Sequence, residues 1–333
     1  MRKHILLLAT GGTIASEETP YGLIPALKPE DLLSYLPELE KDLIITTESL
    51  FSIDSTNMKP ENWIEISKAI AANYDKYDGF IICHGTDTMA YTASAVSYMI
   101  QNSPKPIVFT GAQKPIGLEI TDAKANLRDS IIYASDDDSH GVQIVFNGKV
   151  IEGTRAKKTK TMSYSAFDSI NYPFLAAIYD GKIIRYTNTN IGEEGVSFNH
   201  NLNDKVFLLK LVPGMKPDLI PMIFQIYDGV IIESFGAGGI PESIEKQLFS
   251  ELKKYDPLDK VVVMATQVQN EGSNINVYQV GRKISSNFNV LEAKDLTLEA
   301  TLTKLMWVLA QNYDNWEKLR DKFYEPVGND TLF

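Results

Sequence analysis

The sequence predicts an α/β protein of two domains, and this prediction rests on its pattern and its length. Short apolar runs are each followed by a small-polar turn and then by helical periodicity, an order typical of a mainly parallel, doubly wound sheet. The 333 residues exceed what one core usually holds, since single cores stop growing near ~250–300 residues. A polar stretch from Thr187 to Asp204, rich in Asn and Gly, interrupts the periodicity and indicates a linker.

The first predicted strand is Ile5–Ala9, and the turn after it, Thr10–Ala15, carries Gly11, Gly12 and Thr13. Two glycines let backbone N–H groups approach a ligand closely, and Thr13 adds a hydroxyl. The glycine spacing is not that of a dinucleotide loop, and no G-K-[ST] motif follows. A ligand-binding turn and an ordinary turn both remain open on this stretch alone.

Residues 15–29 lose all periodicity, which indicates a loop directly after this turn. We interpret it as a mobile lid with Gly22 as a hinge and Tyr21 as its polar aromatic tip. The alternative is a surface loop whose tyrosine packs on the body of the protein.

A second unit of the same kind follows a helix whose apolar face begins at Trp63. The strand Phe80–Cys83 leads into the turn His84-Gly85-Thr86-Asp87-Thr88, and helical periodicity resumes at Met89. This turn lies at the carboxyl end of its strand, where ligands bind in open α/β sheets. Taken alone, the stretch equally fits Thr86 or Asp87 acting as an N-cap of the helix.

A third strand is expected at Ile107–Thr110, and Asn147-Gly148 between apolar runs predicts a local antiparallel hairpin over 142–151. Beyond the linker, strands alternate with helices in a smaller second α/β domain. Its expected strands are Val206–Val212, Val230–Phe235 and Val261–Ala265, and its expected helices are Glu242–Lys254 and Glu299–Ala310. We therefore expect an N-terminal domain over 1–190, a linker over 191–204 and a C-terminal domain over 205–333.

Composition excludes several classes of function. A net charge of −11 disfavours nucleic acid as a partner, because a basic footprint is missing. The one cysteine, Cys83, falls inside a predicted strand, so neither an intrachain disulfide nor a cysteine nucleophile is expected. The four histidines are isolated, so no metal is implied. No apolar run approaches a membrane span or a signal-peptide core, so we expect a cytoplasmic protein with no membrane partner.

The two turns together point to a family. Thr10-Gly11-Gly12-Thr13-Ile14-Ala15 with His84-Gly85-Thr86-Asp87-Thr88-Met89 resembles the paired signatures of the bacterial L-asparaginase family, most closely its cytoplasmic type I branch. The likeness covers almost the whole chain. Further blocks that resemble the family are Asp54–Met58, Tyr77–Phe80, Thr110–Gln113, Gly153–Lys158 and Leu298–Leu305.

The resemblance implies an amidohydrolase that converts L-asparagine and water to L-aspartate and ammonia through a threonine nucleophile. It implies Thr13 as first nucleophile with Tyr21 of the lid beside it. It also implies a group of Thr86, Asp87 and Lys158 in which Lys158 acts as base. The remaining residues that it assigns bind the substrate, with Asp87 holding the α-ammonium group: Gly12, Asp54, Ser55, Thr56, Thr86 and Asp87. The residues themselves do not decide whether Thr13 or Thr86 attacks first.

The resemblance further implies no cofactor and a homodimer or homotetramer. Gly239 stands where the family often has an Asn that helps bind the α-amino group across the subunit interface, so the preference for asparagine over glutamine stays open. The alternatives are a glutaminase-asparaginase, an amidase subunit of an amidotransferase, and an amino-acid-binding module without chemistry. The amidotransferase subunit carries an extra N-terminal domain, whereas the first strand here begins at Ile5. The module is disfavoured because Thr13, Thr86, Asp87 and Lys158 occur together.

Overall fold

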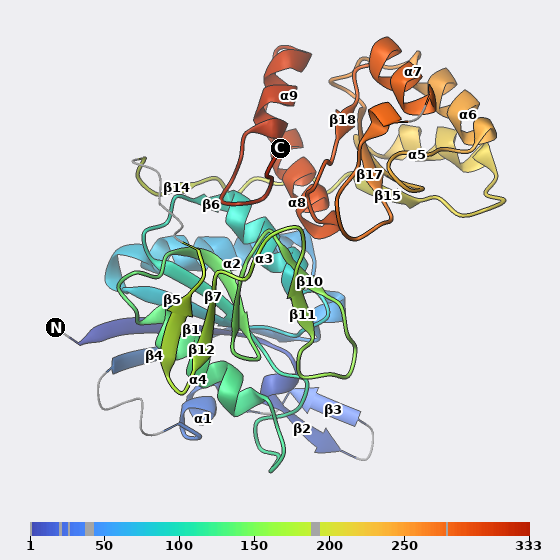
Figure 1. The fold of residues 1–333 in the computed structure, drawn as a ribbon. Helices are drawn as coiled ribbons and strands as arrows, with labels where there is room; N and C mark the ends of the chain where they lie inside the picture. Colours follow the sequence, from blue (N-terminus) through green and yellow to red (C-terminus); the bar gives the residue numbers. More distant parts are fainter. Residues whose placement is uncertain (1, 20–21, 26, 37–42, 188–193, 278) are drawn as a thin grey trace. The chain divides into compact units, whose positions relative to one another are not determined.

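The computed structural model describes residues 2–19, 22–25, 27–36, 43–187, 194–277 and 279–333. The chain divides into two compact units, Met1–His200 and Asn201–Phe333 (Figure 1). Each unit has its own main sheet and its own hydrophobic core. The two-domain α/β fold expected from the sequence is therefore confirmed. Among the described helices, none is long and apolar enough to cross a membrane.

The first unit is built on a mixed sheet whose described strands run in the order β13-β12-β9-β8-β7-β5-β1-β4. The strands at one end of this order are all parallel: β4 (Leu43–Ile53), β1 (Lys3–Gly11), β5 (Gly79–Cys83), β7 (Pro106–Thr110) and β8 (Gly141–Phe146). The others continue it in antiparallel pairs: β9 (Lys149–Glu152), β12 (Ala176–Tyr179) and β13 (Lys182–Arg185). The sheet is thus parallel where the predicted βα units lie.

The predicted hairpin is the pair β8–β9, where the parallel part of the sheet ends. Asn147 and Gly148 both have positive φ angles, 50° and 69°, as a two-residue type I′ turn requires. Asn147 also donates its backbone N–H to Asn126 Oδ1 at 2.8 Å, which ties the turn to the helix α4 (Ala123–Ala134). The prediction of a local antiparallel hairpin is confirmed.

Helices cover both faces of this sheet, so it is doubly wound. The helices α1 (Pro29–Leu33) and α4 lie on one side, and α2 (Pro60–Asn73) and α3 (Met89–Met99) lie on the other (Figure 1). Ile5 and Leu7 of β1 join Leu127 of α4 in one core. Side chains alternate along a strand, so Leu6 and Leu8, which are also buried, face the opposite layer.

Two parts of the first unit differ from the expectation. Ser16–Thr19 (β2) and Gly22–Pro25 (β3) form an antiparallel hairpin, so the expectation of an irregular loop there is wrong. The long strand β4 was not predicted at all, because it shows no clean alternation and no fully buried residue. Both elements are stabilised by backbone pairing with a partner strand, which side-chain periodicity does not report.

The segment after the sheet contributes to the first unit as well. Ser197–Phe198 (β14) pair with Ile100–Gln101 (β6), and Asn199 donates its backbone N–H to the Met99 carbonyl at 2.9 Å. Part of the stretch expected as a linker, 191–204, thus pairs with a strand of the first unit.

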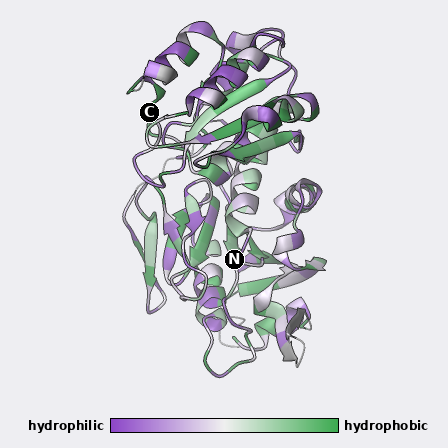
Figure 2. Cartoon of the chain, turned by 90° about the vertical axis from the view of Figure 1, so that its right-hand side faces the viewer, coloured by the Kyte–Doolittle hydropathy of each residue, from purple (hydrophilic) through white to green (hydrophobic). Residues whose placement is uncertain are grey.

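The second unit has a parallel sheet in the order β15-β16-β17-β18. These strands are β15 (Val206–Lys210), β16 (Gly229–Ser234), β17 (Val261–Thr266) and β18 (Leu291–Glu292). Figure 2 shows the strands largely in the green of hydrophobic residues, with purple hydrophilic segments on the covering helices. The helices are α5 (Ile220–Ile226), α6 (Glu242–Leu252), α7 (Gln279–Asn287), α8 (Leu298–Leu309) and α9 (Trp316–Tyr324). The first three of these share one core with the sheet, α8 contacts β15 and β16, and α9 contacts α8.

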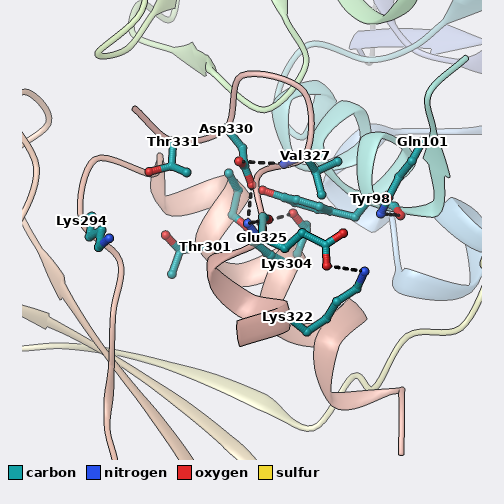
Figure 3. Close-up of polar contacts among 12 residues, drawn as sticks. Tyr98, Gln101, Lys294, Thr301, Lys304, Lys322, Glu325, Val327, Asp330 and Thr331 are labelled. Atoms are coloured by element: carbon teal, nitrogen blue, oxygen red, sulfur yellow. Dashed lines mark hydrogen bonds and ion pairs between the residues drawn. The ribbon is translucent and has the colours of Figure 1, made fainter. Parts of the chain in front are cut away.

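A buried ion pair fixes the end of the chain to α8 (Figure 3). Lys304 Nζ donates to Asp330 Oδ2 at 2.6 Å and to the Glu325 carbonyl at 2.9 Å, while Asp330 Oδ1 accepts the Val327 N–H at 3.1 Å. Both charged side chains are buried, at 1% and 0% exposure. Burial lowers the pKa of Lys304, although the Asp330 carboxylate acts in the opposite direction. The segment after α9 is therefore anchored by a charge pair away from solvent.

Candidate active site

The two signature turns meet because their strands are neighbours. β1 and β5 are parallel and pair from Ile5 with Gly79 to Ala9 with Cys83, so both turns leave the same edge of the sheet. A Cβ atom on Gly12 would lie 2.5 Å from the backbone nitrogen of Gly85, closer than any real contact. The two backbones are thus in direct contact, and glycine is required at Gly12, which also has a φ of +87°.

The first turn presents Thr13 from a short 3₁₀ helix, Thr13–Ala15. Ser16 donates its hydroxyl to the Gly12 carbonyl at 3.0 Å, which closes the turn from the far end. Thr13 is half-buried, and Tyr21, its expected partner on the lid, lies outside the described residues. Of the hydroxyl pair expected from the sequence, the structure therefore describes Thr13 but not Tyr21.

A third turn comes from β4, the strand on the other side of β1. Asp54 caps the 3₁₀ helix Ser55–Asn57 by accepting the Thr56 N–H at 2.9 Å. Ser55 is buried beneath Gly85, where an added Cβ would lie 2.6 Å from Ser55 Oγ, and its carbonyl accepts the Thr88 hydroxyl at 2.8 Å. The three turns are therefore packed against one another through backbone and short side chains.

The turns enclose a cavity of about 140 Å³. Pockets for drug-sized ligands have volumes of about 300–1,000 Å³, so this smaller cavity suits a small polar ligand. Most of the residues predicted as site residues line it, together with Ser16, whereas Thr56 is exposed outside it. The lining residues are Gly12, Thr13, Ser16, Asp54, Ser55, Gly85, Thr86 and Asp87.

Lys158 reaches the cavity wall from a separate hairpin. It is the last residue of β10 (Ala156–Lys158), which pairs with β11 (Phe167–Ser169). Lys158 Nζ donates to Thr86 Oγ1 at 2.8 Å and to Asp87 Oδ1 at 2.6 Å. Thr86 is buried, the Lys158 side chain is 16% exposed, and Asp87 is 57% exposed. The structure thus brings together the Thr-Asp-Lys group, with its carboxylate open to solvent.

Gln113 is a site residue that sequence reasoning missed. It follows β7, the strand next to β5, and its Oε1 lies 3.3 Å from Thr86 Oγ1. The available signal was its position, because a polar residue just past the carboxyl end of a predicted parallel strand lies at the same edge as the other turns. Ser16 was missed as well, although its hydroxyl follows the first turn directly.

His84 supports the second turn from inside the fold. The ring is fully buried, with Nδ1 2.7 Å from the Gly85 carbonyl and Nε2 2.9 Å from Thr92 Oγ1. Since a carbonyl only accepts, Nδ1 carries the proton and Nε2 accepts from the threonine hydroxyl. Burial lowers the pKa of His84 to about 4, so the ring is neutral at physiological pH. It connects the turn to α3 through these two contacts.

The structure offers neither a reactive cysteine nor a metal site among its described residues. Burial raises the pKa of Cys83 to about 12, so its thiol stays protonated inside β5. In the part of the chain that the structure describes, no three His, Cys, Asp or Glu side chains gather in a way that could hold a metal ion.

Models of known families match both units. A model described as the N-terminal domain of asparaginase matches residues 4–191, and one described as the glutaminase/asparaginase C-terminal domain matches residues 205–323. Together they span most of the chain.

Individual proteins are similar over nearly their whole length. The L-asparaginase of Thermococcus kodakarensis is 38% identical over 311 residues, which cover 93% of this chain and 94% of that protein. L-asparaginase 1 of Escherichia coli (strain K12) is 34% identical over 326 residues, with 94% of each covered. The solved structure of the thermostable L-asparaginase from Thermococcus kodakarensis matches with a TM-score of 0.92 at 35% identity, covering 99% of both chains.

A second kind of relative is longer. A glutamyl-tRNA(Gln) amidotransferase subunit of Methanosphaera stadtmanae is 37% identical over 329 residues, which cover 93% of this chain but 73% of that protein.

Proposed function

This chain belongs to the asparaginase family, and on that premise we propose that it hydrolyses the side-chain amide of L-asparagine to L-aspartate and ammonia. The observation that carries the proposal is the shared cavity of Thr13 and Thr86, with Lys158 joined to both Thr86 and Asp87. An amidase needs a nucleophile, a group that activates it and a site for the charged ends of the substrate. In this proposal each of these groups comes from a different strand end: Thr13 after β1, Thr86 after β5 and Ser55 after β4.

We propose Thr13 as the first nucleophile. Its hydroxyl oxygen would attack the amide carbon, ammonia would leave with the proton it receives, and water would release aspartate from the acyl-enzyme. The Thr86 and Lys158 pair would assist by removing or returning protons at the opposite wall. The half-buried position of Thr13 on the cavity supports this assignment.

We propose that the α-groups of the substrate are held by the remaining lining residues. Asp87 leaves much of its carboxylate exposed although it pairs with Lys158, so it can also accept a substrate ammonium group. Ser55 offers a hydroxyl at the buried end of the cavity for the α-carboxylate. Thr56 has no place on the cavity wall in this arrangement, and its contribution would be the backbone N–H that fixes Asp54.

Ammonia release by the purified protein tests this function. L-asparagine, L-glutamine and D-asparagine are supplied separately, with and without chelator and without nucleotide. We expect turnover of L-asparagine that survives chelator, and Thr13→Ala as the matched inactive variant. Activity lost with chelator and restored by zinc, or no turnover of any amide, would refute the proposal.

The second candidate is an amidase subunit that supplies ammonia for a tRNA-bound substrate, as the name of the Methanosphaera stadtmanae relative indicates. Ammonia release from free L-asparagine by the purified chain alone favours the asparaginase. A requirement for a partner protein and charged tRNA before any ammonia appears would favour the amidotransferase component.

We further propose a homodimer or homotetramer of the cytoplasmic type I branch. The similarity to Escherichia coli L-asparaginase 1 supports the branch, and a single buried cysteine is compatible with a reducing compartment. Light scattering after size exclusion gives the mass of the assembly, and a monomer with full activity at dilution would contradict the oligomer.

A further inference from the structure

Gln113 connects Thr86 to a surface loop through the two ends of its side-chain amide. Its Oε1 lies 3.3 Å from Thr86 Oγ1, and its Nε2 donates to the carbonyls of Thr161 and Ser163 at 3.1 Å and 3.2 Å. Both carbonyls belong to the loop 159–166 between β10 and β11, which begins directly after Lys158.

These contacts determine which way the amide points. A backbone carbonyl only accepts hydrogen bonds, so the end of Gln113 that faces Thr161 and Ser163 is the NH₂ group. Its oxygen therefore faces Thr86, and the hydroxyl of Thr86 donates to it. Lys158 Nζ donates to the same hydroxyl oxygen from another direction. The Thr86 proton thus points to Gln113 and not to Lys158, which leaves one lone pair of Oγ1 for a donor in the cavity.

The backbone of Gln113 is held independently of these contacts. Its N–H lies within 3.1 Å and 2.9 Å of the two carboxylate oxygens of Asp122, and the Lys114 N–H donates to the same carboxylate at 3.1 Å. Asp122 is buried and also accepts from Asn126 Nδ2 at 3.2 Å. A change in the Gln113 side chain would therefore leave its main chain anchored.

The loop itself has few other attachments near its tip. Its base is closed where the N–H groups of Thr159 and Lys160 both donate to the Ala166 carbonyl, at 2.8 Å and 3.2 Å. Residues 160–163 are exposed, and Met162 at the tip is 88% exposed. Among the described hydrogen bonds of these residues, those of the Gln113 amide tie the exposed tip to the wall of the cavity. The Lys114 ammonium adds a second contact, 6.0 Å from the centre of the Tyr164 ring.

We propose that Gln113 is a positioning residue for amide hydrolysis: it directs the Thr86 hydroxyl proton and couples that direction to the closed position of loop 159–166. The proposal rests on the proposed function. When the loop is closed, the amide is locked by two carbonyls and Thr86 has one hydroxyl orientation. When the loop leaves, the amide can rotate, and the Thr86 hydroxyl loses its fixed acceptor. In this proposal Gln113 acts through Thr86, and no contact with the substrate is assigned to it.

The test compares Gln113→Met, which has similar length and no hydrogen bond, with Gln113→Glu, which keeps an acceptor for Thr86 but cannot donate to the loop when ionised. Met162→Gln is the control, because it changes the same loop at an exposed side chain. Steady-state ammonia release from L-asparagine gives kcat and KM, and amide hydrogen exchange of the ligand-free protein reports on residues 159–166.

We expect Gln113→Met to lower kcat about tenfold or more, with KM changed less than about threefold, because a group that positions Thr86 acts on the chemical step. Gln113→Glu should lose less kcat, both variants should accelerate exchange in the loop, and Met162→Gln should change neither. Unchanged kcat in Gln113→Met, a KM rise equal to the loss in kcat, or unchanged loop exchange in both variants would overturn the inference. A wild-type protein that releases no ammonia would overturn the proposed function, and the exchange data would still decide whether Gln113 holds the loop.

Discussion

The contact between Gly12 and Gly85 makes the alignment of the two signature turns sensitive to single methyl groups. In Gly12→Ala the new Cβ would lie 2.5 Å from Gly85 N and 2.6 Å from Gly85 Cα, and the residue would keep a φ of +87°. In Gly85→Ala the Cβ would lie 2.6 Å from Ser55 Oγ and 2.7 Å from Ser55 Cβ, with no positive φ. Gly214 has a φ of +80° and no atom within 4 Å of its added Cβ. Alanine variants at the three positions therefore separate the effect of steric collision from the effect of backbone conformation.

The magnitudes follow from these two terms. A positive φ costs a residue with a Cβ about 1–3 kcal/mol, and overpacking of a tight site costs about 1–3 kcal/mol. The free energy of unfolding should therefore fall by the cost of the positive φ in Gly214→Ala and by the cost of overpacking in Gly85→Ala. In Gly12→Ala both costs apply, so it should fall by about 2–6 kcal/mol. Because displacement near 1 Å can cost about 100-fold in rate, kcat/KM should fall by that order in Gly12→Ala and Gly85→Ala.

The assay pairs urea unfolding with ammonia release. Gly214→Ala should lower the free energy of unfolding with kcat/KM within about threefold of the wild type, since Gly214 belongs to the second unit and the residues that line the cavity belong to the first. Gly12→Ala with the activity and stability of Gly214→Ala would refute the reasoning, because the turns would then tolerate a methyl group between them.

Four further predictions concern single side chains. Asp87→Asn should lower kcat/KM at least about 100-fold in steady-state assays, while unfolding changes by less than about 1 kcal/mol, because the exposed pair with Lys158 is screened. The contribution of His84 to the free energy of unfolding should fall by about 3 kcal/mol between pH 6.5 and pH 4, since His84 binds its proton near 6.5 when unfolded but only near 4 when folded, and the difference between wild type and His84→Gln in urea unfolding at the two pH values measures it. Thr13→Ala should abolish turnover but still bind L-aspartate, as measured by calorimetry, and normal turnover in this variant would indicate Thr86 as the nucleophile instead. Lys304→Met should destabilise the protein by about 3–5 kcal/mol in urea, and a loss below about 1 kcal/mol would show that Asp330 is not left as an uncompensated buried charge.

Much of the fold could be predicted because its signals are local. The apolar runs at Ile5–Ala9, Phe80–Cys83 and Ile107–Thr110 became central parallel strands, and Asn147-Gly148 became a two-residue hairpin turn. Strands buried on both faces are continuously apolar, so they are visible without a partner. The strand β4 was invisible for the opposite reason: it lies at the edge of the sheet, with mixed exposure along its length.

The same contrast between local and long-range signals applies to the residues of the candidate site. That Thr13 and Thr86 share an edge follows from two parallel strands, each with a polar turn at its carboxyl end, and this much the sequence determined by itself. Lys158 was assigned only through a family resemblance, because it is 72 residues from Thr86 and no spacing rule relates them. Gln113 was not assigned at all.

Only the tertiary structure decided how these groups are joined. The direction of the Thr86 proton depends on which end of the Gln113 amide faces two loop carbonyls, and those carbonyls lie 48 and 50 residues away along the chain. Hydrogen bonds between distant segments depend on ångström-scale placement by packing, whereas strand and turn propensities depend on a few adjacent residues. The residues of the site are therefore encoded locally, and their mutual orientation is a property of the folded chain.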